Sequence, residues 1–145
     1  MNLSKHLNNK KKDFFFSIGG IGEIGGNNYL YSFGGEQLII DAGISFAGDE
    51  LPGVDISIPD PSYFLDKDIK PKALILTHAH EDHVGGLEYY FDKINFTIYC
   101  TEFTFAYIRH KFNRVQNFEN KFKIIKPYEE IKFNNFSFSL VPTTH

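Results

Sequence analysis

Short apolar runs, separated by turns rich in glycine and asparagine, recur along the sequence and predict a β-rich fold. The first runs are FFFSI at 14–18, NYLYSF at 28–33 and QLIID at 37–41. The second run alternates between apolar and polar positions, which is typical of a half-buried strand. Gly34-Gly35-Glu36, between the second and third runs, is a tight-turn signal, so we expect these two runs to form a β-hairpin.

The second half of the sequence alternates between strand-like and helix-like segments. The run ALIL at 73–76 is continuously apolar and predicts a buried, central strand. Thr101 is a suitable N-cap for the second of two helices. The expected order is a strand at 72–80, a helix at 84–94, a strand at 95–100, a helix at 101–115 and closing strands within 121–145, with Asn134 and Asn135 as a turn. This succession predicts a layered α/β sandwich.

The segment GGIGEIGGNN at 19–28 contains the spacing G-x-G-x-x-G at Gly20, Gly22 and Gly25. In dinucleotide-binding folds a helix follows these glycines directly, and its N-terminus holds the pyrophosphate. Here a strand–turn–strand pattern follows instead. We therefore interpret the glycines as a loop that bends and approaches a neighbouring segment closely, and we expect no dinucleotide partner.

Composition and charge narrow the classes of protein that the chain can represent. The chain has 145 residues, 42% of them hydrophobic and 23% charged, which predicts one globular domain over 13–145. Its net charge is −3, so any contact with nucleic acid would need a local basic patch. Residues 1–12 contain three consecutive lysines and are interpreted as a flexible tail. No apolar stretch is long enough to cross a membrane, and Cys100 is the single cysteine. These features predict a cytoplasmic protein with no membrane partner.

The strongest chemical signal is the motif THAHEDHVGG at 77–86. His78 and His80 lie two residues apart at the expected end of a strand, where a period of two directs both imidazoles to one face and lets them bind one ion. Asp82 and His83 follow where the chain turns into the next helix, within reach of a second ion. Imidazole and carboxylate are normal ligands of Zn²⁺, so the motif predicts a zinc site.

Three further residues are judged by their position relative to this motif. Glu81 should point away from the ions by the same alternation, as a solvated carboxylate or one that supports a ligand. Asp41 ends an apolar strand, where a buried carboxylate needs partners, and we expect it to hold the histidine loop by hydrogen bonds. His145 follows the last apolar run. On position alone, it either completes a three-histidine site with His78 and His80 or has no metal role.

Taken together, these motifs resemble a known family. HAHEDH after ALILT, with Asp41 before it and His145 behind it, is similar to the metallo-β-lactamase fold, an αββα sandwich. GGIGEIGGNNYLY, IIDAGISF, PGVDISIPDPSYF and LTHAHEDHVGGL resemble the N-terminal part of the ribonuclease J family, bacterial enzymes of the β-CASP group. The resemblance extends from about Phe16 to His145. It implies an α/β fold, the N-terminal part of the sandwich only, with the glycine loop bordering a catalytic cleft.

The resemblance also implies roles for individual residues. Asp41 matches a structural aspartate. Asp82 and His83 match ligands of a second zinc ion and are expected to be the catalytic pair. The ligands implied for the first zinc ion are His78, His80 and His145. The implied activity is hydrolysis of RNA phosphodiesters, as a 5′-to-3′ exonuclease and an endonuclease in RNA maturation and decay, by a hydroxide that two zinc ions activate and that attacks phosphorus in line.

The sequence departs from the family pattern after His145. In the family, a bridging aspartate, the β-CASP insertion, a further metal-binding histidine and a C-terminal domain follow this position, and this sequence contains none of them. We therefore expect the activity, and assembly into homo-oligomers (dimers or tetramers), to belong to a longer protein of which this is the N-terminal segment. The alternative is a truncated, catalytically inactive chain that binds at most one zinc ion, or a partner-binding module.

Overall fold

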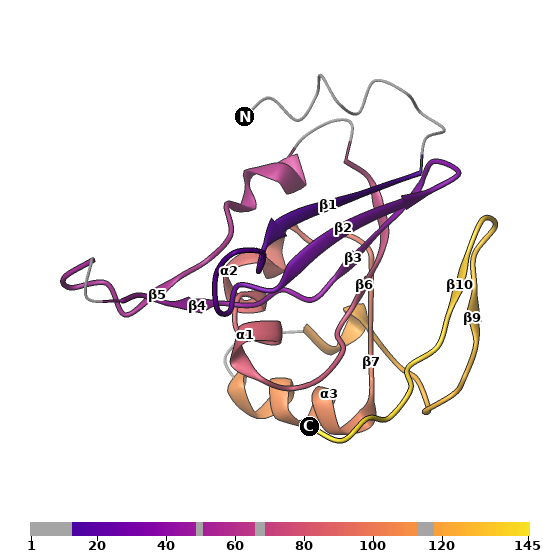
Figure 1. Ribbon diagram of the computed structural model, residues 1–145. Coiled ribbons are helices and arrows are strands. Elements are labelled where there is room, and N and C mark those ends of the chain that lie inside the picture. The colour runs from indigo at the N-terminus through magenta and orange to yellow at the C-terminus, as the bar shows by residue number, and fades with distance from the viewer. Residues whose placement is uncertain (1–12, 49–50, 66–68, 113–117) are drawn as a thin grey trace.

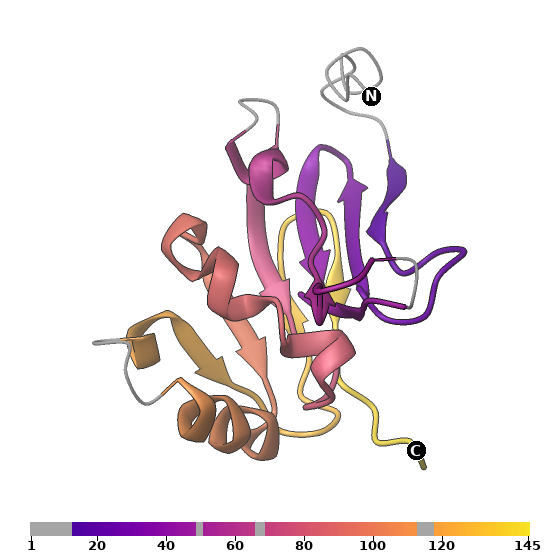
Figure 2. The same cartoon turned by 90° about the vertical axis from the view of Figure 1, so that its left-hand side faces the viewer.

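The computed structural model describes residues 13–48, 51–65, 69–112 and 118–145. They form a six-stranded sheet with helices packed on one face and a two-stranded hairpin on the other (Figures 1 and 2). The expected tail at 1–12 and the expected end of the second helix at 113–115 lie outside the described residues. Within the described ranges, no helix combines the length and the apolar character needed to cross a membrane.

The central sheet has an antiparallel half and a parallel half. Its strands are β1 (Phe14–Gly19), β2 (Asn28–Phe33), β3 (Glu36–Ile40), β6 (Pro71–Ile75), β7 (Thr97–Cys100) and β8 (Phe122–Ile124). They lie side by side in this order, antiparallel from β1 to β3 and parallel from β3 to β8. β2 and β3 form the expected hairpin, closed by Gly34 and Gly35, which both have the positive φ angles that this tight turn requires.

The helices cover one face of this sheet (Figure 2). They are α1 (Glu81–Val84), α2 (Leu87–Tyr90), α3 (Glu102–Lys111) and the 3-10 helices Pro61–Leu65, Phe91–Lys93 and Phe118–Lys121. The single helix expected at 84–94 is wrong, because Gly86 donates its backbone N–H to the carbonyl of Ala42 and so separates α1 from α2. α3 begins after Thr101, whose side chain caps its first turn as expected.

A short hairpin covers the opposite face. It consists of β9 (Ile131–Lys132) and β10 (Ser137–Phe138), with Asn134 and Asn135 in the turn as expected. On this face the ring of Tyr99 lies 5.4 Å from that of Phe138, centroid to centroid. The larger core lies under the helices and includes Leu74 and Ile98 of the central strands. The described residues therefore form an α layer, a central sheet and a hairpin of a second β layer.

β3 and β6 end next to each other, and the candidate residues follow these two ends. The strands pair in parallel, with Ile40 opposite Ile75. Because the carboxyl ends of parallel strands meet at one edge of a sheet, Asp41 lies close to the motif at 77–86. The chain after Asp41 forms an excursion that contains the short pair β4 (Ser45–Phe46) and β5 (Ile56–Ser57).

Candidate metal centre

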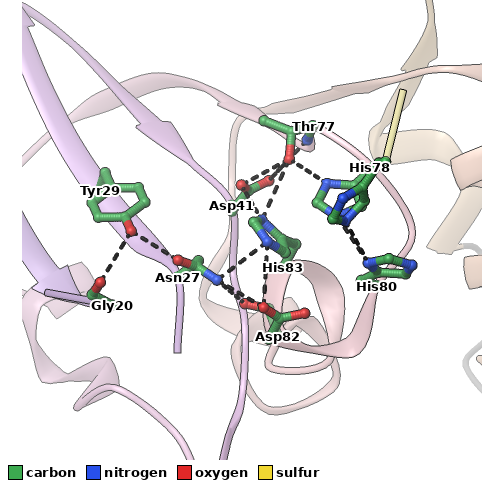
Figure 3. Close-up of polar contacts among 10 residues, drawn as sticks. Gly20, Asn27, Tyr29, Asp41, Thr77, His78, His80, Asp82 and His83 are labelled. Atoms are coloured by element: carbon green, nitrogen blue, oxygen red, sulfur yellow. Dashed lines mark hydrogen bonds and ion pairs between the residues drawn. The ribbon is translucent and has the colours of Figure 1, made fainter. Parts of the chain in front are cut away.

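The candidate ligands meet beside the end of β3 (Figure 3). His78 and His80 lie on the segment between β6 and α1, Asp82 and His83 lie in the first turn of α1, and His145 is the last residue of the sequence. The expectation that His78 and His80 sit on a strand is wrong, because β6 ends at Ile75 and His80 is already the N-cap residue of α1. The two rings nevertheless face each other. Their convergence comes from the turn between strand and helix, not from the alternation of a strand.

Three histidines form a cluster that fits a metal ion. One ring nitrogen from each of His78, His80 and His145 lies within 4.8 Å of the other two. Nε2 of His78 is 3.2 Å, and Nε2 of His145 is 2.9 Å, from Nδ1 of His80. Nitrogens that bind one tetrahedral zinc ion at about 2.05 Å lie roughly 3.3 Å apart, so both the donor chemistry and these separations suit Zn²⁺.

Thr77 links Asp41 to the first histidine of the cluster. Its hydroxyl lies 3.0 and 2.9 Å from the two carboxylate oxygens of Asp41, and 3.0 Å from Nδ1 of His78. An ionised carboxylate only accepts hydrogen bonds, so the hydroxyl donates to Asp41 and accepts from His78. We therefore assign His78 the tautomer whose lone pair is on Nε2. Burial and the neighbouring His83 lower the pKa of His78, which favours this neutral form.

Asp41 also holds His83 directly. Its Oδ2 accepts a hydrogen bond from Nδ1 of His83 at 2.7 Å, which leaves Nε2 of that ring for a ligand role. Burial works to lower the pKa of His83, but the hydrogen bond and charge of Asp41 outweigh it, so the pKa is raised. Asp41 is 2% exposed and has a φ of +62°. A non-glycine residue keeps this uncommon conformation only where its surroundings enforce it.

Asp82 and His83 form a second donor pair beside the three-histidine cluster. Oδ2 of Asp82 lies 3.4 Å from Nε2 of His83, and the ring of His83 lies 4.0 Å from that of His78, centroid to centroid. Among the described residues, the three-histidine cluster is the one group in which three or more donors have the spacing of metal ligands. The Asp82–His83 pair would supply two of the ligands of a second ion, fewer than the three or four protein ligands of ordinary zinc sites.

Glu81 points away from both groups, towards α3. Its carboxylate oxygens accept hydrogen bonds from the Tyr107 hydroxyl and from Nζ of Lys111. Burial works to raise the pKa of Glu81, but the hydrogen bonds from Lys111 and Tyr107 lower it overall. Glu81 therefore ties the motif to α3.

The glycine segment packs against the motif and leads into β2 rather than into a helix. The backbone N–H of Asn27 donates to the carbonyl of Asp82 at 3.0 Å, and that of Gly26 to the carbonyl of Ile44 at 2.7 Å. The chain after β3 approaches the motif closely as well. A Cβ atom on Gly43 would lie 1.7 Å from the carbonyl oxygen of Asp82, so this approach requires glycine at position 43. The glycine segment thus borders the candidate site, as the family resemblance implies.

Sequence reasoning missed three residues of the site: Thr77, Asn27 and Gly43. Thr77 is the first residue of the motif, directly before His78, and its hydroxyl was the available signal. Asn27 donates from its side chain to Oδ2 of Asp82 at 3.0 Å, although the two residues are 55 positions apart. No spacing within the sequence indicates that contact, because it depends on how the glycine segment folds back onto the motif.

A family model described as the Metallo-beta-lactamase superfamily matches residues 21–140. This range contains Asp41 and the whole motif at 77–86. The chain belongs to the metallo-β-lactamase superfamily.

Within this superfamily, the chain is similar to ribonucleases of the J type. It is 41% identical over 135 residues to ribonuclease J 1 of Streptococcus pyogenes, and 37% identical over 142 residues to ribonuclease J of Helicobacter pylori. The matches cover 90% and 97% of this chain, but 23% and 21% of the relatives. The chain thus spans between a fifth and a quarter of the length of these relatives. The resemblance to ribonuclease J is confirmed.

A solved structure of a protein of unknown function from Enterococcus faecalis has the same fold. The TM-score is 0.62 at 19% identity, covering 92% of this chain and 38% of that one. At this identity the similarity concerns the fold alone. Together with the family match, it confirms the expected α/β metallo-β-lactamase fold.

Proposed function

We propose that the full-length protein carrying this chain is a metal-dependent ribonuclease that hydrolyses RNA phosphodiesters with two zinc ions. The observation that carries this proposal is the convergence of the ring nitrogens of His78, His80 and His145 within 4.8 Å. The Asp82–His83 pair lies directly beside them. The similarity to ribonucleases J of Streptococcus pyogenes and Helicobacter pylori supports RNA as the substrate.

The three histidines would hold one ion, and Asp82 and His83 would contribute to holding the second. When bound, two such ions lower the pKa of a water molecule and neutralise charge on the phosphoryl oxygens. Asp41 keeps His83 in the tautomer with a free Nε2, directly, and does the same for His78 through Thr77. Because these hydrogen bonds orient the histidine rings before an ion binds, binding of the metal ions requires little reorganisation of the rings.

Hydrolysis adds water across the bond between phosphorus and the ribose 3′-oxygen, so the products carry a 3′-hydroxyl and a 5′-phosphate. We propose both 5′-to-3′ exonuclease and endonuclease activity, in RNA maturation and decay. The support for these modes is the resemblance to ribonuclease J. A cytoplasmic location and a homo-oligomeric assembly remain predictions for the full-length protein.

The test is degradation of a 5′-monophosphorylated RNA by the purified full-length protein and its Asp82→Ala variant. We expect the wild-type protein to degrade the RNA and Asp82→Ala to reduce the rate to background. Asp92→Ala, an exposed carboxylate in the 3-10 helix after α2, is the matched control and should keep wild-type activity. Full activity of Asp82→Ala would contradict the proposal. A wild-type protein without activity that binds a single ion would favour the inactive, one-zinc alternative.

A further inference from the structure

The side-chain amide of Asn27 lies between the two donors of the Asp82–His83 pair (Figure 3). Its Nδ2 is 3.0 Å from Oδ2 of Asp82 and 3.2 Å from Nε2 of His83. The same nitrogen is 3.1 Å from the backbone carbonyl oxygen of Asp82. One amide group therefore contacts both atoms that would bind the second ion, and also the backbone of one of them.

Hydrogen-bond chemistry fixes the orientation of this amide. The carboxylate and the carbonyl of Asp82 only accept, so the amide atom that faces them is the NH₂ group. The amide oxygen faces the other way and accepts from the hydroxyl of Tyr29 at 2.8 Å. A reversed amide would place its oxygen against two acceptors of Asp82. Tyr29 therefore holds Asn27 in the orientation that presents two N–H groups to the pair.

The amide offers two hydrogens to three acceptors, so one contact can be lost without leaving an N–H unpaired. Nε2 of His83 is the acceptor that an ion would take. The two contacts to Asp82 use the backbone carbonyl and one lone pair of Oδ2, and the other lone pairs of the carboxylate stay available. The bonds to Asp82 are therefore compatible with an ion bound by the same carboxylate.

The backbone around Asn27 is fixed as well. Its N–H donates to the carbonyl of Asp82 at 3.0 Å, and its own carbonyl accepts from the N–H of Gly43 at 2.9 Å. Both backbone polar groups of Asn27 are thus hydrogen-bonded, independently of its side chain. The backbone of Asn27 is therefore tied to the backbone of Asp82, and its side-chain amide is held by Tyr29 and Asp82.

We propose that Asn27 is a positioning residue for the second metal ion, which it serves by holding the Asp82 carboxylate in its ligand orientation. The proposal rests on the proposed two-ion site. The proposed role predicts different effects on the binding of the two ions. Asn27 contacts the Asp82–His83 pair, whereas the site of the first ion is formed by ring nitrogens of His78, His80 and His145. Loss of the amide should therefore weaken binding of the second ion and leave binding of the first unchanged. Tyr29 acts one step further out by holding the amide oxygen.

The experiment is a titration of the metal-free, full-length protein with Zn²⁺ by calorimetry, repeated with Co²⁺ by absorption spectroscopy. Asn27→Ala should weaken the second binding step by about 10–100-fold, the usual effect of removing a group that orients a metal ligand, and should leave the first step unchanged. Tyr29→Phe should weaken the same step by a smaller factor. Tyr31→Phe is the matched control, because it removes a hydroxyl two positions along the same strand, from a ring that stacks on Phe33.

The outcomes are distinct. An unchanged or tightened second step in Asn27→Ala, or equal weakening of both steps, would overturn the positioning role. If Asn27→Ala fails to fold, Tyr29→Phe decides: a second step weakened relative to Tyr31→Phe supports the role, and an unchanged one overturns it. A single binding step in the wild-type protein would overturn the two-ion site itself, and with it this role.

Discussion

Oδ2 of Asp41 lies 2.7 Å from Nδ1 of His83, while the same carboxylate accepts hydrogen bonds from the backbone and the hydroxyl of Thr77. Through Thr77 it also reaches Nδ1 of His78. One buried carboxylate therefore orients a histidine from each of the two donor groups. The proposed site therefore depends on Asp41, although Asp41 is not one of the proposed metal ligands.

Asp41→Asn should weaken metal retention by about 10–100-fold. The backbone N–H of Thr77 and Nδ1 of His83 contact different carboxylate oxygens of Asp41, and in asparagine one of these oxygens is replaced by an NH₂ group that cannot accept. Asparagine tolerates a positive φ, so the backbone at this position is preserved. Asp41→Ala should additionally lower the free energy of unfolding by about 1–3 kcal/mol, since it leaves buried donors unpaired. Metal content after dialysis and urea unfolding measure the two effects. Asp60→Asn, at an exposed carboxylate, is the control, and wild-type metal retention by Asp41→Asn would contradict the role.

His145→Ala should weaken binding of the first ion by more than about 10-fold, because it removes a ligand rather than a group that orients one. Stability should change little, since His145 is exposed. His110→Ala, an exposed histidine in the last turn of α3, is the matched control. The comparison uses zinc affinity from competition with a chelating dye. Equal affinities of the two variants would remove His145 from the ligand set.

Local signals in the sequence predicted much of the fold. The Gly34-Gly35 turn, the continuously apolar strand at 73–76 and the cap at Thr101 are each encoded within a few residues, and the structure contains all three. The break between α1 and α2 could not be predicted in this way. It depends on the hydrogen bond from Gly86 to Ala42, which only the folded chain brings together.

The candidate site likewise contains residues that local sequence signals reveal and residues that only contacts between distant segments reveal. The motif residues were found because their chemistry and spacing are concentrated in six positions. The expectation that His78 and His80 lie on a strand was wrong, because β6 ends at Ile75 and a turn brings the two rings together. Asn27 was missed because its contact with Asp82 spans 55 positions and depends on the packing of the glycine segment.

Gly43→Ala should displace Asp82 and so weaken binding of the second ion more than binding of the first. The added Cβ would meet the carbonyl oxygen of Asp82, so one segment must move, at a cost of about 1–3 kcal/mol in stability. Gly22→Ala is the control. Its φ of +79° makes the substitution costly to a similar degree, roughly 1–2 kcal/mol, but a Cβ there meets nothing within 4 Å. Thermal melts and zinc titrations of both variants separate the effects. Equal zinc affinities would contradict the close approach inferred for Gly43.

Glu81→Gln should leave the number of bound ions unchanged, because Glu81 faces Tyr107 and Lys111 on α3 and not the metal centre. The loss of the ion pair should lower the free energy of unfolding by about 0.5–1 kcal/mol, since the pair is partly exposed. Metal analysis and chemical denaturation measure both quantities. An ion lost from Glu81→Gln would identify this carboxylate as a ligand.

Cys100 should be unreactive in the folded protein, because burial raises the pKa of its thiol to about 12. An unfolded thiol ionises near pH 8.5, so this group favours the folded state fully below about pH 8.5. Its contribution is then lost as the pH rises towards 12. Alkylation by iodoacetamide at about pH 8 should be slow in buffer and fast in urea. Equal rates in buffer and in urea would show that Cys100, the last residue of β7, is accessible to solvent in the folded protein.

The most direct test of the central claim is the number of ions bound per chain, measured by native mass spectrometry and elemental analysis on the full-length protein. We expect two zinc ions in the wild-type protein and one in Asp82→Ala, retained by His78, His80 and His145. A wild-type protein with a single ion, or an Asp82→Ala variant that still holds two tightly, would contradict the two-ion site.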